Sequence, residues 1–132
     1  ATSRLRWYIR TNPDIVVIAL GGNDGLRGLS VEHMKINLGE AIELALFEKI
    51  KVLLAGMQIP RNYGTEYTES FRNAFYELAE KYHLKMIPFL VKGVGGVSSL
   101  KQADGIHPNP EGHKILARTV IEYLEPLLTK KE

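Results

Sequence analysis

Three short apolar runs, separated by longer segments with helical spacing, constrain the fold of this chain most. The runs cover residues 15–20, 52–57 and 85–89. Each is too short for a buried helix, and the first two are continuously apolar, which is typical of strands covered on both faces. Strands that alternate with helices predict a parallel sheet with helices on both faces. The chain is therefore predicted to be an α/β protein.

Four helices are predicted around these strands, over about residues 2–10, 31–50, 65–83 and from 110 onward. Ser30 and Asn109 can cap two of them, and Pro110 suits a first helical position. Apolar side chains recur at helical spacing on one face of each of the last three helices. They are Met34, Leu38, Ala41, Ile42, Ala45 and Leu46, then Phe71, Phe75, Leu78 and Tyr82, and finally Leu116, Val120, Leu124 and Leu127.

Composition narrows the possible functions. The 132 residues are enough for one domain with a real core, and we predict a single domain over residues 1–132. The absence of cysteine excludes disulfides, thiol catalysis and zinc–thiolate sites. A net charge of +2 is too small to argue for nucleic acid or an anionic membrane. No apolar run approaches the ~20 residues that span a bilayer, so we predict no stable membrane insertion.

The first apolar run raises a question about strand pairing. It is as hydrophobic as a central strand, yet nothing earlier in the chain could pair with one of its edges. Proteins normally protect a long apolar edge with charge, proline or a bulge, and this run has none of these. We infer that one or two strands lie upstream of Ala1, as a removed N-terminal piece, a separate chain, a swapped partner or disordered residues.

Ligands of open parallel sheets bind beyond the carboxyl ends of the strands. The loop around His107 and Asp104 follows the last predicted strand, so it should reach this edge. A neutral imidazole at His107 can act as a general base, and Asp104 can accept a hydrogen bond from its other nitrogen. The alternative is that both residues only cap the final helix.

Residues 21–24 follow the first predicted strand and should reach the same edge. Gly22 allows a close approach of backbone to ligand, and the amide of Asn23 can donate to an oxyanion. The alternative is an ordinary turn, for which this sequence is equally suitable. Apolar and aromatic loop residues could line an acyl pocket here or simply pack in their loops. They are Leu26, Leu29, Ile59, Pro60 and Tyr63.

Two segments carry a family resemblance. IALGGNDGLRGL at residues 18–29 resembles the third conserved block of SGNH/GDSL hydrolases, and DGIHPNPEGHKILA at 104–117 resembles the fifth. MQIPRNYG at 57–64 is similar to a loop of the bacterial thioesterase, lysophospholipase and arylesterase branch. The resemblance implies a flavodoxin-like three-layer α/β/α fold and hydrolysis of small-molecule acyl esters or thioesters without a cofactor. It also implies that Asn23 is an oxyanion donor, Asp104 the orienting acid and His107 the base.

The sequence departs from this family at its start. The Gly-Asp-Ser-Leu block that carries the nucleophilic serine is absent, so the resemblance implies that this chain is the C-terminal three-quarters of the enzyme and inactive alone. Ser98 and Ser99 are the best alternative serines by position, but no nucleophile-elbow motif surrounds them. The resemblance favours a periplasmic or secreted protein, and a cytoplasmic one stays open.

Two other hypotheses remain. The first is a non-catalytic binding module derived from a hydrolase fold. The second is a metal-dependent hydrolase that uses Asp24, Asp104 and His107, although such sites usually need more ligands.

Overall fold

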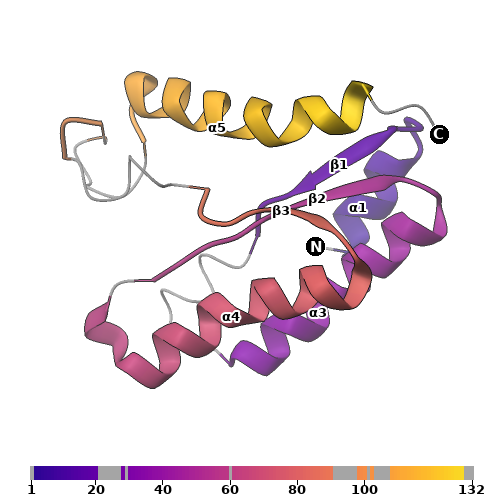
Figure 1. Cartoon of the computed structure of the whole chain (residues 1–132). Helices are drawn as coiled ribbons and strands as arrows, with labels where there is room; N and C mark the ends of the chain where they lie inside the picture. The colour runs from indigo at the N-terminus through magenta and orange to yellow at the C-terminus, as the bar shows by residue number, and fades with distance from the viewer. Residues whose placement is uncertain are drawn as a thin grey trace.

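The computed structural model describes residues 2–20, 28, 30–59, 61–90, 98–100, 102 and 108–129. Helices and strands alternate along this part of the chain (Figure 1). Their bounds are α1 Thr2–Ile9, β1 Ile15–Ile18, α3 Val31–Phe47, β2 Lys51–Ala55, α4 Thr65–Tyr82, β3 Lys85–Ile87 and α5 Pro110–Thr129. Two short 3-10 helices are η1 Arg61–Tyr63 and η2 Ser98–Leu100.

The three strands form a parallel sheet in the order β1-β2-β3. Helices α1, α3 and α4 cover one face of this sheet, and α5 covers the other (Figure 1). The protein therefore has the three-layer α/β/α architecture that the sequence predicts.

The central strand β2 divides the core into two parts. Val52 and Leu54 point into a large cluster shared with α1, α3 and α4, whereas Leu53 and Ala55 point toward α5. This alternation follows from the two-residue period of a strand. Leu53 and Leu54 are both 0% exposed, so β2 is covered on both faces, as predicted.

The prediction for the first strand is partly wrong. β1 ends at Ile18 rather than Leu20, and Val17 is 37% exposed although the sequence predicts that both faces are covered. The reason is the position of α5, which packs over β2 and β3 and leaves the Val17 face of β1 open. In the part of the chain that the structure describes, β1 also has one edge without a partner strand.

The predicted helix positions are correct except near their ends. Ser30 caps α3 by accepting a hydrogen bond from the backbone N–H of His33 at 3.2 Å. The helix stops at Phe47, before the predicted Ile50, and Lys49 then takes a left-handed conformation with φ 62°. The sequence predicts Leu46 on the buried face, but it is exposed, one residue before the end of α3.

Side-chain contacts join α3 to α4. The hydroxyl of Tyr82 donates to the Glu43 carboxylate at 2.5 Å, and Lys35 forms an ion pair with Glu77 at 2.5 Å. The hydrogen bond to Glu43, together with partial burial, raises the pKa of Tyr82 to about 12. The Glu77 carboxylate likewise raises the pKa of Lys35. Gly39 lies under the Tyr82 ring, where a Cβ atom would come 3.4 Å from the hydroxyl oxygen.

Candidate active site

The three strands end at one level, so the segments that follow them share one edge of the sheet. Ile18 pairs with Leu54, and Ala55 pairs with Ile87, which ends β3. The two segments that follow β1 and β2 along the chain therefore start within one or two strand spacings of the end of β3. This carboxyl edge is the place where ligands bind in open parallel sheets.

Gly56 joins the ends of β2 and β3 closely. Its N–H donates to the carbonyl of Ile87 at 2.7 Å, and its carbonyl accepts from the N–H of Leu90 at 3.0 Å. A Cβ atom at this position would lie only 2.5 Å from the carbonyl oxygen of Pro88. The sequence predicts Gly56 inside a strand, but β2 ends at Ala55. The two hydrogen bonds of Gly56 fix the chain immediately after β2 against the chain immediately after β3.

Helix α5 runs antiparallel to β2 and begins at the carboxyl edge. Near the other end of α5, the Lys51 ammonium donates to the carbonyl oxygen of Leu127 at 3.3 Å. Lys51 is the first residue of β2, so the C-terminal end of α5 lies at the amino edge of the sheet and Pro110 at the opposite, carboxyl edge (Figure 1).

Asn109 holds the start of α5 in place. Its Oδ1 accepts from the N–H of Gly112 at 2.9 Å, which is the predicted helix cap. Its Nδ2 also donates to the carbonyl of Ser99 at 2.8 Å, and its backbone N–H donates to the carbonyl of Leu100 at 2.9 Å. One residue therefore ties the helix to the 3-10 turn η2.

A further hydrogen bond closes the segment between η2 and α5. The side-chain amide of Gln102 donates to the carbonyl of Pro108 at 3.2 Å. The two residues flank positions 103–107, which include Asp104 and His107. The described residues thus fix both ends of the segment that carries the predicted acid and base. Neither the hydrogen bond of Gln102 nor the second hydrogen bond of Asn109 is predicted from the sequence.

Most of the predicted site residues lie outside the described part of the chain. These are Gly22, Asn23, Asp24, Leu26, Leu29, Pro60, Asp104 and His107. Their roles stay predictions. Two residues of the predicted acyl pocket are described. Ile59 is 8% exposed and belongs to the large core cluster, and Tyr63 is 37% exposed in η1.

The alternative serines have ordinary positions. Ser30 is the cap of α3, and Ser3 and Ser70 are exposed on α1 and α4. Ser99 is exposed in η2, and its carbonyl accepts the hydrogen bond from Asn109. None of these four described serines has a hydrogen bond from its hydroxyl to a histidine among the residues that the structure describes.

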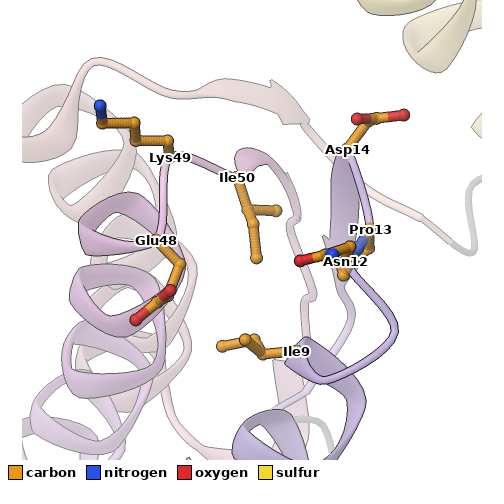
Figure 2. A pocket seen from close by; sticks show the side chains of 7 residues that line it. All are labelled: Ile9, Asn12, Pro13, Asp14, Glu48, Lys49 and Ile50. Carbon is orange, nitrogen blue, oxygen red and sulfur yellow. The ribbon is translucent and has the colours of Figure 1, made fainter.

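A hollow lined by described residues lies at the other edge of the sheet. It has a volume of about 240 Å³ and lies between the turn before β1 and the turn before β2. Figure 2 shows Ile50 pointing toward Ile9 between the two turns, with Asn12 and Glu48 to either side and the Asp14 carboxylate directed away. Because it is at the amino edge, it is remote from the ends of the strands. We assign it no role in catalysis.

Other site types were also considered within the described ranges. No cluster of three histidine or acidic side chains that could hold a metal ion occurs among these residues. His33, His83 and His113 are exposed. Among the described helices, none is both long and apolar enough to cross a membrane.

Comparison with known proteins gives the same family throughout. The model of the GDSL-like lipase/acylhydrolase family matches residues 1–115. Esterase TesA of Pseudomonas aeruginosa is 44% identical over 116 residues, which are 88% of this chain and 58% of that protein. The thioesterase 1/protease 1/lysophospholipase L1 of Escherichia coli is 32% identical over 88% of this chain and 56% of its own length. The chain thus spans a little over half the length of these curated relatives.

Solved structures agree with the fold. A crystal structure of TesA superposes with a TM-score of 0.89 at 41% identity, covering 96% of this chain and 71% of that one. The psychrotrophic esterase EstA from Pseudoalteromonas sp., in a structure inhibited by monoethylphosphonate, gives a TM-score of 0.90 at 28% identity, covering 98% of this chain and 71% of that one. The arrangement at the carboxyl edge of the sheet agrees with these superpositions. Together with the sequence matches, they show that the chain belongs to the GDSL-like lipase/acylhydrolase family, the SGNH hydrolases.

Proposed function

We propose that the protein hydrolyses carboxylic esters or thioesters, and that this chain supplies the base, the orienting acid and one oxyanion donor. The observation that carries the proposal is the family match over residues 1–115, which includes Asn23, Asp104 and His107. The similar proteins are named as an esterase, an arylesterase and a thioesterase/lysophospholipase. Acyl esters of short to medium chain length, aryl esters and lysophospholipids are therefore the substrates to test.

The described residues support this assignment of roles. Asn109, Gln102 and Leu100 fix both ends of the segment that carries Asp104 and His107, next to the carboxyl ends of the strands. A general base must keep its position relative to a nucleophile within hydrogen-bond reach, because proton transfer depends on that distance. A segment held at both ends suits this requirement.

The proposed reaction has two steps. His107 takes the proton of a serine hydroxyl as its oxygen attacks the acyl carbon, and Asn23 donates a hydrogen bond to the carbonyl oxygen as it becomes negative. The protonated His107, oriented by Asp104, then gives the proton to the departing alcohol or thiol. In the second step His107 activates water, which attacks the acyl-serine and releases the carboxylic acid.

The serine of this proposal comes from a segment that precedes residue 1. Among the described residues, β1 has one edge without a partner strand. A further parallel strand could form a ladder of hydrogen bonds with this edge. Such a strand would end at the same carboxyl edge as β1. In this arrangement the chain forms the C-terminal three-quarters of one domain, and the added strand carries the nucleophile.

The experiment compares this chain with the same chain joined to its upstream region, using p-nitrophenyl butyrate as substrate. We expect turnover only with the upstream region present. In that longer protein, His107→Ala should lower kcat/KM by at least about 10³-fold, because the residual rate then depends on binding and the oxyanion hole. His113→Ala is the matched control, since His113 is an exposed histidine near the start of α5.

Three outcomes would contradict the proposal. Full turnover by the chain alone would remove the need for an upstream serine. No turnover by the longer protein with any acyl ester would favour a binding module, and unchanged ligand affinity in His107→Ala would agree with that. Loss of activity in EDTA would favour a metal-dependent hydrolase that uses Asp24, Asp104 and His107.

A further inference from the structure

Helix α1 exposes two large aromatic side chains. Trp7 is 61% exposed and Tyr8 is 55% exposed, and their ring centroids lie 6.1 Å apart. Leu5, on the opposite side of the helix, is 9% exposed and belongs to the large core cluster. With about 100° between successive residues, Trp7 lies almost directly opposite the buried side of α1. Its ring therefore points away from the body of the protein.

Arginines surround this tryptophan. Arg4 is three residues before Trp7 on α1, so it lies beside Trp7 on the helix surface, and it also neighbours Tyr8. Arg6 is exposed about 100° around the helix from Trp7, on the side away from Arg4. Arg10 is exposed in the turn that follows α1, where its backbone N–H donates to the carbonyl of Trp7 at 3.3 Å. None of the three arginines forms an ion pair with another described residue. We call Arg4, Arg6, Trp7, Tyr8 and Arg10 the α1 surface.

The α1 surface is also the place where positive charge gathers. The first acidic residue of the chain is Asp14, so the first 13 residues carry three positive charges and no negative side chain. Without these three arginines the formal net charge of the chain, +2, would be −1. Helix α1 and the turn that follows it therefore form a local excess of positive charge.

Exposed tryptophan flanked by arginine has the composition of a membrane-interface contact. Tryptophan and tyrosine favour the headgroup level of a bilayer, where the ring is apolar and its polar atom stays wet. Arginines next to them interact with the negative phosphates of anionic lipids. A protein partner could also use these residue types, but a wholly basic helix face would then need a matching acidic partner surface.

We propose that the α1 surface docks the protein on an anionic phospholipid bilayer. Trp7 enters the headgroup region, and Arg4, Arg6 and Arg10 contact lipid phosphates. The docking is peripheral and reversible, because eight helical residues with one central aromatic group give far less affinity than a spanning helix. It needs no turnover, so it can be tested separately from ester hydrolysis.

The test is sedimentation of the protein, with its upstream region present, together with phosphatidylcholine vesicles that contain or lack phosphatidylglycerol. We expect binding only to the anionic vesicles, with a loss at high salt. Each arginine near an anionic surface raises the membrane partition coefficient roughly fivefold. The triple variant Arg4→Gln, Arg6→Gln and Arg10→Gln should therefore bind about 100-fold more weakly. Trp7→Ala should bind about tenfold more weakly.

The matched control removes three exposed charges elsewhere, with Arg72→Gln, Lys85→Gln and Arg118→Gln. This variant has the same net charge as the α1 triple variant, so it should keep most of its binding. A second measurement is the fluorescence of Trp7, the single tryptophan of this chain, obtained as the difference from the Trp7→Phe protein. Anionic vesicles should shift its emission to the blue.

Several results would overturn the proposal. Equal loss of binding in both triple variants would mean that only net charge matters. Equal binding to neutral vesicles would remove the role of the arginines. Emission from Trp7 that is already blue-shifted in buffer, and insensitive to vesicles, would mean that the upstream region or another protein surface covers α1. Esterase activity on p-nitrophenyl butyrate is measured in parallel, so a failure of the proposed function would be seen independently.

Discussion

Replacing Asn109 by alanine should loosen the segment that carries Asp104 and His107 while leaving the core intact. Among the hydrogen bonds of this side chain, one caps α5 and one reaches the carbonyl of Ser99. Loss of a helix cap costs about 1 kcal/mol. The bond to Ser99 is exposed, so its loss adds about 0.5 kcal/mol, at the low end for a neutral hydrogen bond.

Together these losses lower the free energy of unfolding of Asn109→Ala by about 1.5 kcal/mol. Divided by the entropy of unfolding of a 132-residue chain, this corresponds to a fall in Tm of about 5 °C. Asn109→Asp separates the two contacts, because a carboxylate keeps the capping acceptor and loses only the donor to Ser99. It should lower Tm by about 2 °C. Asn73→Ala, at an exposed position of α4, is the control and should change Tm by less than about 2 °C.

The assay is thermal unfolding followed by far-UV circular dichroism, combined with ester turnover by the protein that includes its upstream region. We expect Asn109→Asp to lower kcat clearly although it lowers Tm only slightly. The reason is that the hydrogen bond to the carbonyl of Ser99, which holds the segment before α5, is lost. Equal Tm values for Asn109→Ala and Asn73→Ala would refute the structural reasoning. Full turnover by Asn109→Ala at a temperature where it is folded would refute the link to catalysis.

Three further variants test other contacts. Phe75→Ala removes a ring that is 0% exposed and packs edge-on against Phe71 at 5.4 Å, so it should lower the free energy of unfolding by 3–5 kcal/mol, roughly, in urea titrations. Gly39→Ala should be neutral or stabilise by up to about 1 kcal/mol, because helix propensity improves and the nearest atom is the movable Tyr82 hydroxyl; clear destabilisation would show that α3 and α4 cannot adjust. Tyr82→Phe should lower stability by about 1.5 kcal/mol at pH 8, through loss of the bond to Glu43. The pKa of Tyr82 is raised to about 12, so the stabilising bond is complete below pH 10 and is lost as the pH rises toward 12. The difference between wild type and Tyr82→Phe should shrink over that range, and a constant difference would contradict the assignment.

Periodicity was sufficient to predict the order of the elements and most of the core. Met34, Leu38, Phe71 and Phe75 are all buried as predicted, because spacing around a helix depends only on local geometry. The exposure of Val17 could not be predicted in this way. It depends on which strands α5 covers, and that is a property of tertiary packing.

The candidate site was predictable to a smaller extent. Asn109 was recognised as a cap because capping is local, whereas its bond to Ser99 depends on the path of the ten residues between them. Asp104 and His107 stay predictions from sequence and family resemblance.

Of the described helices, α5 alone covers one face of the sheet, and this has a consequence for local unfolding. Among the described residues, the fully buried members of the cluster beneath α5 are Leu53, Ala55 and Ile87, and the α5 side chains that pack on them, such as Val120 and Leu124, are half-buried. Detaching α5 therefore exposes much less apolar surface than opening the opposite face, and it should occur with a lower free energy than global unfolding. In native-state hydrogen exchange, the amides of α5 should exchange before those of α3 and β2. Because α5 also anchors the segment before it, mild denaturant should abolish turnover while most of the sheet is still protected.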